Sequence, residues 1–135
     1  MSLKLKNSQI YEYALSIKDF YNNCSEIYLP AKCSFYLYKN LNILIDAAAD
    51  IDRTRQFIID KFGEEDEETE GTYKIPLDKQ ELVQEELKDL SEIVQELNIH
   101  MIPLKDFKDA ELPIKYIKSL SFMIEDNEEE EEYGG

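Results

Sequence analysis

The sequence predicts an α+β fold that is mostly α: a helical hairpin of a long and a shorter helix, with flanking helices and a small two-stranded sheet. Apolar residues recur at steps of three and four in two separate segments, which is typical of helices that pack on each other. The interval between Pro30 and Gly63 contains neither proline nor glycine, so one of these helices is long. Two short apolar runs that end near prolines are typical of strands.

The first helix is expected from Gln9 to about Asn22, with Asn7 or Ser8 as its N-cap. Its apolar residues form one stripe, at i, i+3, i+4, i+7, i+10 and i+11: Ile10, Tyr13, Ala14, Ile17, Phe20 and Tyr21. A helix buries such a stripe against the rest of its domain. We therefore expect this helix to flank the hairpin.

The long helix of the hairpin is expected to begin at Pro30, whose backbone suits the first helical position, and to end at Phe62, just before Gly63. Its apolar seam alternates steps of four and three and consists of Leu37, Leu41, Leu44, Ala48, Ile51, Arg55, Ile58 and Phe62. Arg55 is the one charged member, and we expect it to extend to the edge of the seam rather than take part in chemistry. The polar segment 39–42 leaves open whether this is one helix or two.

The shorter helix of the hairpin follows an acidic loop at 64–71 and a short strand at 72–76. Asp78 and Glu81 resemble a capping box at its start. Its stripe repeats the steps of four and three: Val83, Leu87, Leu90, Val94 and Leu97. The matching periods predict antiparallel packing against the long helix, with an acidic face left in solvent.

The C-terminal part contains a β-like run at 98–104 and a last helix. The run is expected to pair in parallel with the strand at 73–75, because a helix connects them. Leu112-Pro113 opens the last helix, whose predicted apolar face is Ile114, Ile117, Leu120 and Ile124. We predict one helical domain over residues 1–124 and an acidic disordered tail at 125–135.

The net charge of −15 is concentrated in the loop at 64–71 and the tail at 125–135, which together hold thirteen acidic residues and no basic one. The remaining chain is nearly neutral and has no basic cluster to neutralise phosphates, so we expect no nucleic-acid partner. No apolar run is long enough to cross a bilayer, and the start shows no signal sequence. Cys24 and Cys33 fit two reduced, partly buried thiols. These observations favour a cytoplasmic protein without a membrane partner.

Candidate chemistry is sparse. His100 is the only histidine in the sequence, and a pair with Cys24 or Cys33 is conceivable, but a packed structural histidine is the ordinary interpretation. The glycines fit no phosphate-binding loop. Residues 66–71 place carboxylates at positions 1, 3 and 5 of an EF-hand-like loop, yet position 12 is Leu77, so a solvated acidic turn is favoured. We predict no catalytic residue, no metal site and no cofactor.

Tyrosines supply the candidate interface, because six of the nine lie in the first 38 residues. Tyrosine combines a large apolar area with a polar tip, which suits protein interfaces and also the outer layer of a small core. The candidate interface residues are Tyr11, Tyr28, Tyr36 and Tyr38.

Five stretches of the sequence resemble a family of small, functionally uncharacterised proteins encoded by phages and prophages of Gram-positive bacteria. They are KLKNSQIYEYA (4–14), YLPAKCSFYLYKN (28–40), DRTRQFIIDKFG (52–63), EGTYKIPLDK (70–79) and ELNIHMIPLKDF (96–107). The resemblance implies a viral or prophage origin and action inside a bacterial host, and it carries no catalytic residues. The glutamate-rich tail departs from the family pattern.

The sequence thus favours a non-enzymatic phage or prophage protein for binding or assembly, acting in the bacterial cytoplasm on a phage or host protein. The sequence does not decide whether the protein forms a homo-oligomer. The acidic loop and tail favour an alternative, an acidic inhibitor that blocks a host nucleic-acid-binding enzyme by imitating nucleic acid. An enzyme of unrecognised type is the third hypothesis.

Overall fold

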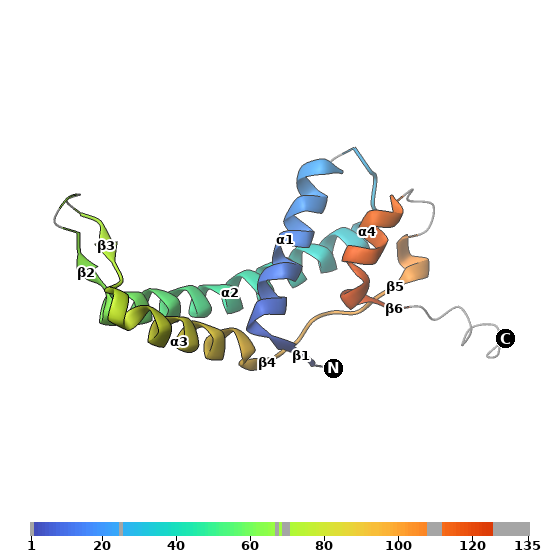
Figure 1. Cartoon of the computed structure of the whole chain (residues 1–135). Coiled ribbons are helices and arrows are strands. Elements are labelled where there is room, and N and C mark those ends of the chain that lie inside the picture. The colour runs from blue at the N-terminus through green and yellow to red at the C-terminus, as the bar shows by residue number, and fades with distance from the viewer. Residues whose placement is uncertain (1, 25, 67, 69–70, 108–111, 126–135) are drawn as a thin grey trace.

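The computed structural model describes residues 2–24, 26–66, 68, 71–107 and 112–125, and within them the fold is mostly helical α+β, as predicted (Figure 1). The helices are α1 (Asn7–Asn23), α2 (Ala31–Phe62), α3 (Gln80–Glu92) and α4 (Ile114–Ser119). The strands are β1 (Leu3–Lys6), β2 (Glu64–Glu65), β3 (Tyr73–Lys74), β4 (Val94–Leu97), β5 (Ile102–Pro103) and β6 (Ile124–Glu125). In these parts of the chain, no helix has the length and apolar content needed to cross a membrane.

Helix α2 is one continuous helix of 32 residues and organises the rest of the fold. The polar segment 39–42 does not interrupt it, because Asn40 is buried and finds hydrogen-bond partners outside the helix. Pro30 has an extended backbone and is the cap before the helix, not its first residue. Gly63 ends the helix as predicted, and its N–H donates to the carbonyl of Ile59.

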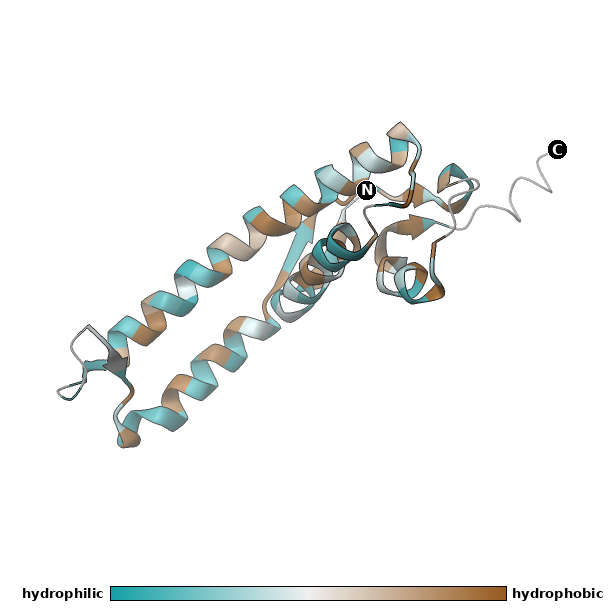
Figure 2. Cartoon of the chain, turned by 90° about the horizontal axis from the view of Figure 1, so that it is seen from above, coloured by the Kyte–Doolittle hydropathy of each residue, from teal (hydrophilic) through white to brown (hydrophobic). Residues whose placement is uncertain are grey.

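Helices α1 and α3 pack on different halves of α2. Helix α1 crosses the N-terminal half, and α3 runs back antiparallel along the C-terminal half, which confirms the predicted hairpin (Figure 1). Figure 2 shows α2 and α3 extending together away from α4. The predicted stripe of α1 is largely confirmed, since Ile10, Ala14, Ile17 and Phe20 are buried.

The start of α1 differs from the expectation. The helix begins at Asn7, and Lys6 is the cap, with its N–H donating to Oε1 of Gln9 at 2.9 Å. Asn7 is therefore not a cap. Its side chain is buried and points to α3 and β4, because the preceding strand β1 holds it against them.

The predicted pairing of the strand at 73–75 with the run at 98–104 is wrong. Strand β3 pairs antiparallel with β2 in a hairpin, with Glu64 opposite Lys74. Strand β5 pairs in parallel with β6, and β1 pairs antiparallel with β4. The reason is that α3 separates the two predicted partners: β3 lies at the far end of α2, whereas β5 lies beside α4 (Figure 1). The small sheet is thus three separate two-stranded pairs among the described residues.

Helix α3 is shorter than its apolar stripe predicted. It ends at Glu92, and the segment Val94–Leu97 is strand β4, in which Val94 is more than half exposed. The helix stops there because β1 supplies an edge for the chain to pair with. The predicted capping box is absent at its start, where Lys79 is the cap and no side chain caps the helix. A 3₁₀ turn at Leu77–Lys79 precedes it.

The predicted apolar face of the last helix, α4, and its continuation is confirmed in part: Leu120 is buried and Ile124 packs against the core. Ile114 and Ile117 are exposed, and Tyr116 and Met123, which were not predicted, are buried instead. A 3₁₀ turn at Ser121–Met123 replaces the expected continuation of the helix. Of the predicted tail at 125–135, Glu125 belongs to β6 and the other residues lie outside the described part of the chain.

Candidate binding site: a groove between three helices

Helices α1, α2 and α3 together line a groove with a volume of about 360 Å³. Each helix contributes residues spaced three or four apart, so each presents one face to it. The lining residues are Asn7, Ser8, Tyr11 and Leu15 of α1, Ile51 and Arg55 of α2, and Leu87, Leu90 and Ser91 of α3. The groove lies where α1 and α3 cover different stretches of α2 and are joined by Asn7 at the start of α1.

Asn7 holds the corner at which α1 meets α3. Its Nδ2 donates to the carbonyl of Leu90 at 2.8 Å, and its Oδ1 accepts from Nε2 of Gln95 at 2.7 Å. Its backbone N–H donates to the carbonyl of Ile93. These bonds satisfy the buried amide and set the angle between the two helices, which in turn sets the shape of the groove.

Tyr11, Asp52 and Arg55 form a polar cluster on one wall of the groove. The Tyr11 hydroxyl donates to Oδ1 of Asp52, and the Arg55 guanidinium lies over the Tyr11 ring, 5.6 Å from its centroid. Burial and the bond to Asp52 raise the pKa of Tyr11 to about 12, against an opposing effect of Arg55. The Asp52 carboxylate is thus engaged by Tyr11.

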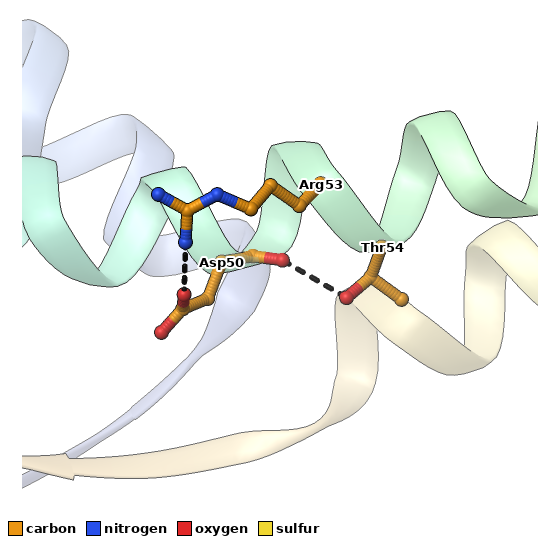
Figure 3. Close-up of polar contacts among 3 residues, drawn as sticks. All are labelled: Asp50, Arg53 and Thr54. Carbon is orange, nitrogen blue, oxygen red and sulfur yellow. Dashed lines mark hydrogen bonds and ion pairs between the residues drawn. The ribbon is translucent and has the colours of Figure 1, made fainter.

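Arg55 and Arg53, on the same helix, differ in whether they form an ion pair. Asp50 and Arg53, three residues apart, form an ion pair at 2.8 Å, and Thr54 donates to the Asp50 carbonyl (Figure 3). Asp52 and Arg55 have the same spacing, but Arg55 takes part in none of the ion pairs found within the described ranges. Its guanidinium therefore keeps its hydrogen-bond donors available at the groove.

The tyrosines lead to a prediction about alkaline pH. We expect the free energy of unfolding to fall as pH rises from about 10 to about 12. The pKa of Tyr11 is raised to about 12 in the folded chain from an ordinary value of 10, so its contribution is complete below pH 10 and lost through pH 12. Tyr21 has its pKa raised to about 12 as well, by burial and by Tyr38.

Urea titrations at a series of pH values would measure this slope, with Tyr11→Phe and Tyr21→Phe each expected to flatten it. Tyr28→Phe, at a side chain 83% exposed, is the matched control and should leave the slope unchanged. An equal slope in all four proteins would contradict the prediction.

The four candidate interface tyrosines lie in separate environments. Tyr11 lines the groove, and Tyr28 is exposed in the connection between α1 and α2. Tyr36 stacks on His100, with ring centroids 5.1 Å apart, whereas Tyr38 lies against Tyr21. The structure thus brings Tyr11 alone of the four to the groove, and the interface assignment of the others stays a prediction.

His100 and the cysteines make structural contacts. Asn40, fully buried in α2, accepts from the His100 backbone N–H at 2.8 Å and donates to the His100 carbonyl at 2.9 Å. Cys24 and Cys33 are both buried, and Sγ of Cys33 donates to the carbonyl of Asp106. His100 lies between β4 and β5, not in the strand that was predicted for it.

The described residues of the acidic loop are β2, Asp66, Glu68 and Gly71, and β2 pairs with β3. The Asp66 backbone N–H donates to the carbonyl of Thr72, and its carboxylate accepts from the backbone N–H of Glu68. Gly71 has φ of +84°, a conformation that favours glycine. Leu77, at the twelfth position of the EF-hand-like pattern, is exposed. Within the described part of the chain, no three histidine, cysteine or carboxylate side chains group as metal ligands would.

The hairpin and α3 form one acidic region, which we call the acidic arm and define as residues 64–96. It contains thirteen acidic residues and three lysines, so it carries −10 of the net charge of −15. The acidic residues of α3 are all exposed: Glu81, Glu85, Glu86, Asp89 and Glu92. None of these carboxylates lines the groove.

The sequence marks several of the groove residues individually, but it does not indicate that they come together in a groove. Arg55, Leu87 and Leu90 belong to the two predicted seams, and Tyr11 was a candidate for an interface. Leu15 was missed, although it is a large apolar residue off the buried stripe of α1 and four residues after Tyr11. That spacing is a local signal for a second apolar face.

A comparison of the chain with protein-family models, curated proteins and solved structures finds no match.

Proposed function

We propose that this protein is a non-enzymatic binding module that engages a protein partner through the groove between α1, α2 and α3. The observation that carries the proposal is an apolar groove with an exposed apolar rim. Leu15 lines it and is 64% exposed, while Ile51, Leu87 and Leu90 form its deeper part. Apolar grooves between helices are a recurrent docking site for protein segments.

The contacts of the reactive side chains support a binding role over a catalytic one. His100 is stacked on Tyr36, with its backbone held by Asn40. Cys33 is fully buried at the start of α2. A nucleophile or general base has to reach a substrate, and these groups serve the packing of the core instead.

The setting of this function rests on the sequence resemblance. Similarity to small phage and prophage proteins supports a viral origin, action in the cytoplasm of a bacterial host, and a partner that is either a phage or a host protein. The role in binding or assembly is supported by the groove, since the resembled family is functionally uncharacterised.

The acidic arm favours a second candidate, inhibition of a host nucleic-acid-binding enzyme by imitation of nucleic acid. Helix α3 is about 20 Å long and carries five acidic residues and Lys88. Duplex DNA carries about 12 charges over that length. The net charge of α3 is about a third of this, so we rank mimicry below docking in the groove.

Photo-cross-linking tests the proposal. We expect Leu15→benzoylphenylalanine, expressed in a Gram-positive host with and without phage infection, to form an adduct with one discrete protein, because its ring projects from the rim of the groove. The matched control is Phe57→benzoylphenylalanine, which is 68% exposed on α2 but does not line the groove.

Mass spectrometry of the adducts separates the outcomes. An adduct at position 15 and none at position 57 supports docking in the groove. The same adducts at both positions, or none at position 15 under either condition, would rule it out. A third variant, Glu85→benzoylphenylalanine, samples the acidic arm, and an adduct there with a nucleic-acid-binding enzyme would favour mimicry.

A further inference from the structure

Resting on the proposed function, we infer that the groove takes an acidic amphipathic helix of a partner protein. One carboxylate of that helix pairs with the Arg55 guanidinium, and its apolar residues fill the space between Leu15, Ile51 and Leu87.

Charge complementarity identifies Arg55 as the recognition group. Arg55 is the one charged residue among the described residues that line the groove. Most of the other polar side chains there have partners within the fold, and Ser8 carries no charge: Asn7 bonds to α3 and β4, the Tyr11 hydroxyl donates to Asp52, and the Ser91 hydroxyl donates to the Lys88 carbonyl. Arginine is well suited to this role, because its planar guanidinium can bind a carboxylate with two parallel hydrogen bonds.

Tyr11 and Asp52 prepare Arg55 for an external carboxylate. The chain contains thirty acidic residues that an arginine could pair with. Asp52 lies three residues before Arg55, a spacing at which a helical ion pair can form. Asp52 Oδ1 accepts from the Tyr11 hydroxyl, and Asp52 and Arg55 form none of the ion pairs found among the described residues. The Arg55 guanidinium lies over the Tyr11 ring. An arginine stacked on a ring still presents the N–H groups at its edge to a ligand.

Charges of both signs lie beside the groove. Lys18 and Glu12 each lie three residues from Leu15 on α1, while Lys88 lies three residues before Ser91 and Glu86 four residues before Leu90 on α3. Both lysines are exposed, and neither belongs to an ion pair among the residues described. Arg55 is thus the charge that lines the groove itself, and an apolar floor beside it fits a helix that has leucine-like residues on one face and a carboxylate next to them.

Fluorescence anisotropy with two labelled synthetic peptides tests the inference on the full chain. Both peptides carry leucines at i, i+3, i+4 and i+7, and the flanking residues are glutamates in one and glutamines in the other. We expect the glutamate peptide to bind about tenfold more tightly, even though the protein as a whole is strongly acidic, and added salt to reduce that preference.

Arg55→Gln should abolish the preference for the glutamate peptide, whereas Arg53→Gln, at the ion-paired arginine two residues away, should leave it intact. Leu15→Asn should weaken the binding of both peptides, because it removes an apolar contact at an exposed position. Equal binding of the two peptides, or a preference that survives Arg55→Gln, overturns the inference. A cross-link at position 15 that persists in Arg55→Gln would also overturn it while leaving the proposed function in place.

The same variants distinguish a helical partner from two other possible occupants of the groove, a second copy of this chain and a small apolar acid. Sedimentation velocity that shows a dimer, lost in both Leu15→Asn and Arg55→Gln, would assign the groove to a second copy of this chain and overturn the inference. Displacement of the glutamate peptide by decanoate, with direct binding of decanoate that depends on Arg55, would assign it to a small apolar acid instead. Failure of decanoate to compete supports a helical partner.

Discussion

Leu44→Ala is expected to lower the free energy of unfolding by about 2–5 kcal/mol. Leu44 lies in the middle of α2, is fully buried and belongs to the main core cluster. Truncation removes buried methyl groups and leaves a cavity beside a continuous helix that cannot readily move inward. Such a loss is a large share of the roughly 5–15 kcal/mol that stabilises a domain of this size.

Two comparisons make the Leu44 experiment decisive. Leu87 of α3 is only half-buried, so Leu87→Ala should cost less than Leu44→Ala. Glu92→Ala removes a solvated charge and should stay within about 0.5 kcal/mol. Denaturant titrations of the three variants measure these costs, and a Leu44→Ala variant as stable as Glu92→Ala would contradict the packing of α2.

Asn40→Ala is expected to cost roughly 2–5 kcal/mol, because each buried polar group left without a partner costs about 1–3 kcal/mol. The Asn40 side chain bonds to both the N–H and the carbonyl of His100, much as a neighbouring strand would. It thereby joins the middle of α2 to the segment between β4 and β5. Its replacement leaves two backbone groups unpaired and opens a small cavity.

The matched control for Asn40 is Asn42→Ala, since Asn42 is exposed on the same helix and should tolerate the change within about 0.5 kcal/mol. Amide hydrogen exchange gives a second readout: the His100 N–H should exchange faster in Asn40→Ala at conditions where the fold persists. Unchanged protection of that amide would show that the bond to Asn40 contributes little.

The helices are the part of this fold that local residues predict well. The bounds of α2 follow from Pro30, Gly63 and the absence of helix breakers between them, and the buried stripe of α1 follows from its spacing. These signals act within one or two turns, so they are legible without knowledge of the rest of the chain. The helical hairpin could be predicted because the apolar seams of both helices repeat at steps of four and three residues.

Strand pairing and the ends of α3 and α4 depended on contacts between distant residues. Strand β1 pairs with β4 about 90 residues later, and this pairing ends α3 although its apolar stripe continues through Leu97. A two-residue strand such as β3 has too few side chains to specify its partner, so the turn at Gly71 decided it. At α4, packing against α1 buries Tyr116, whose ring meets Phe20, rather than Ile114 and Ile117.

In the candidate site, too, some features follow from the local sequence and others from contacts between distant residues. The seam pattern marks Arg55 as a charged residue at an apolar interface, and the tyrosines mark the start of the chain as suited to contacts. The crossing of α1 over α2 placed Tyr11 against Asp52 and under the guanidinium of Arg55, which forms no ion pair among the described residues. Periodicity describes which face a helix buries, whereas the angle at which two helices cross is set by the side chains that meet there.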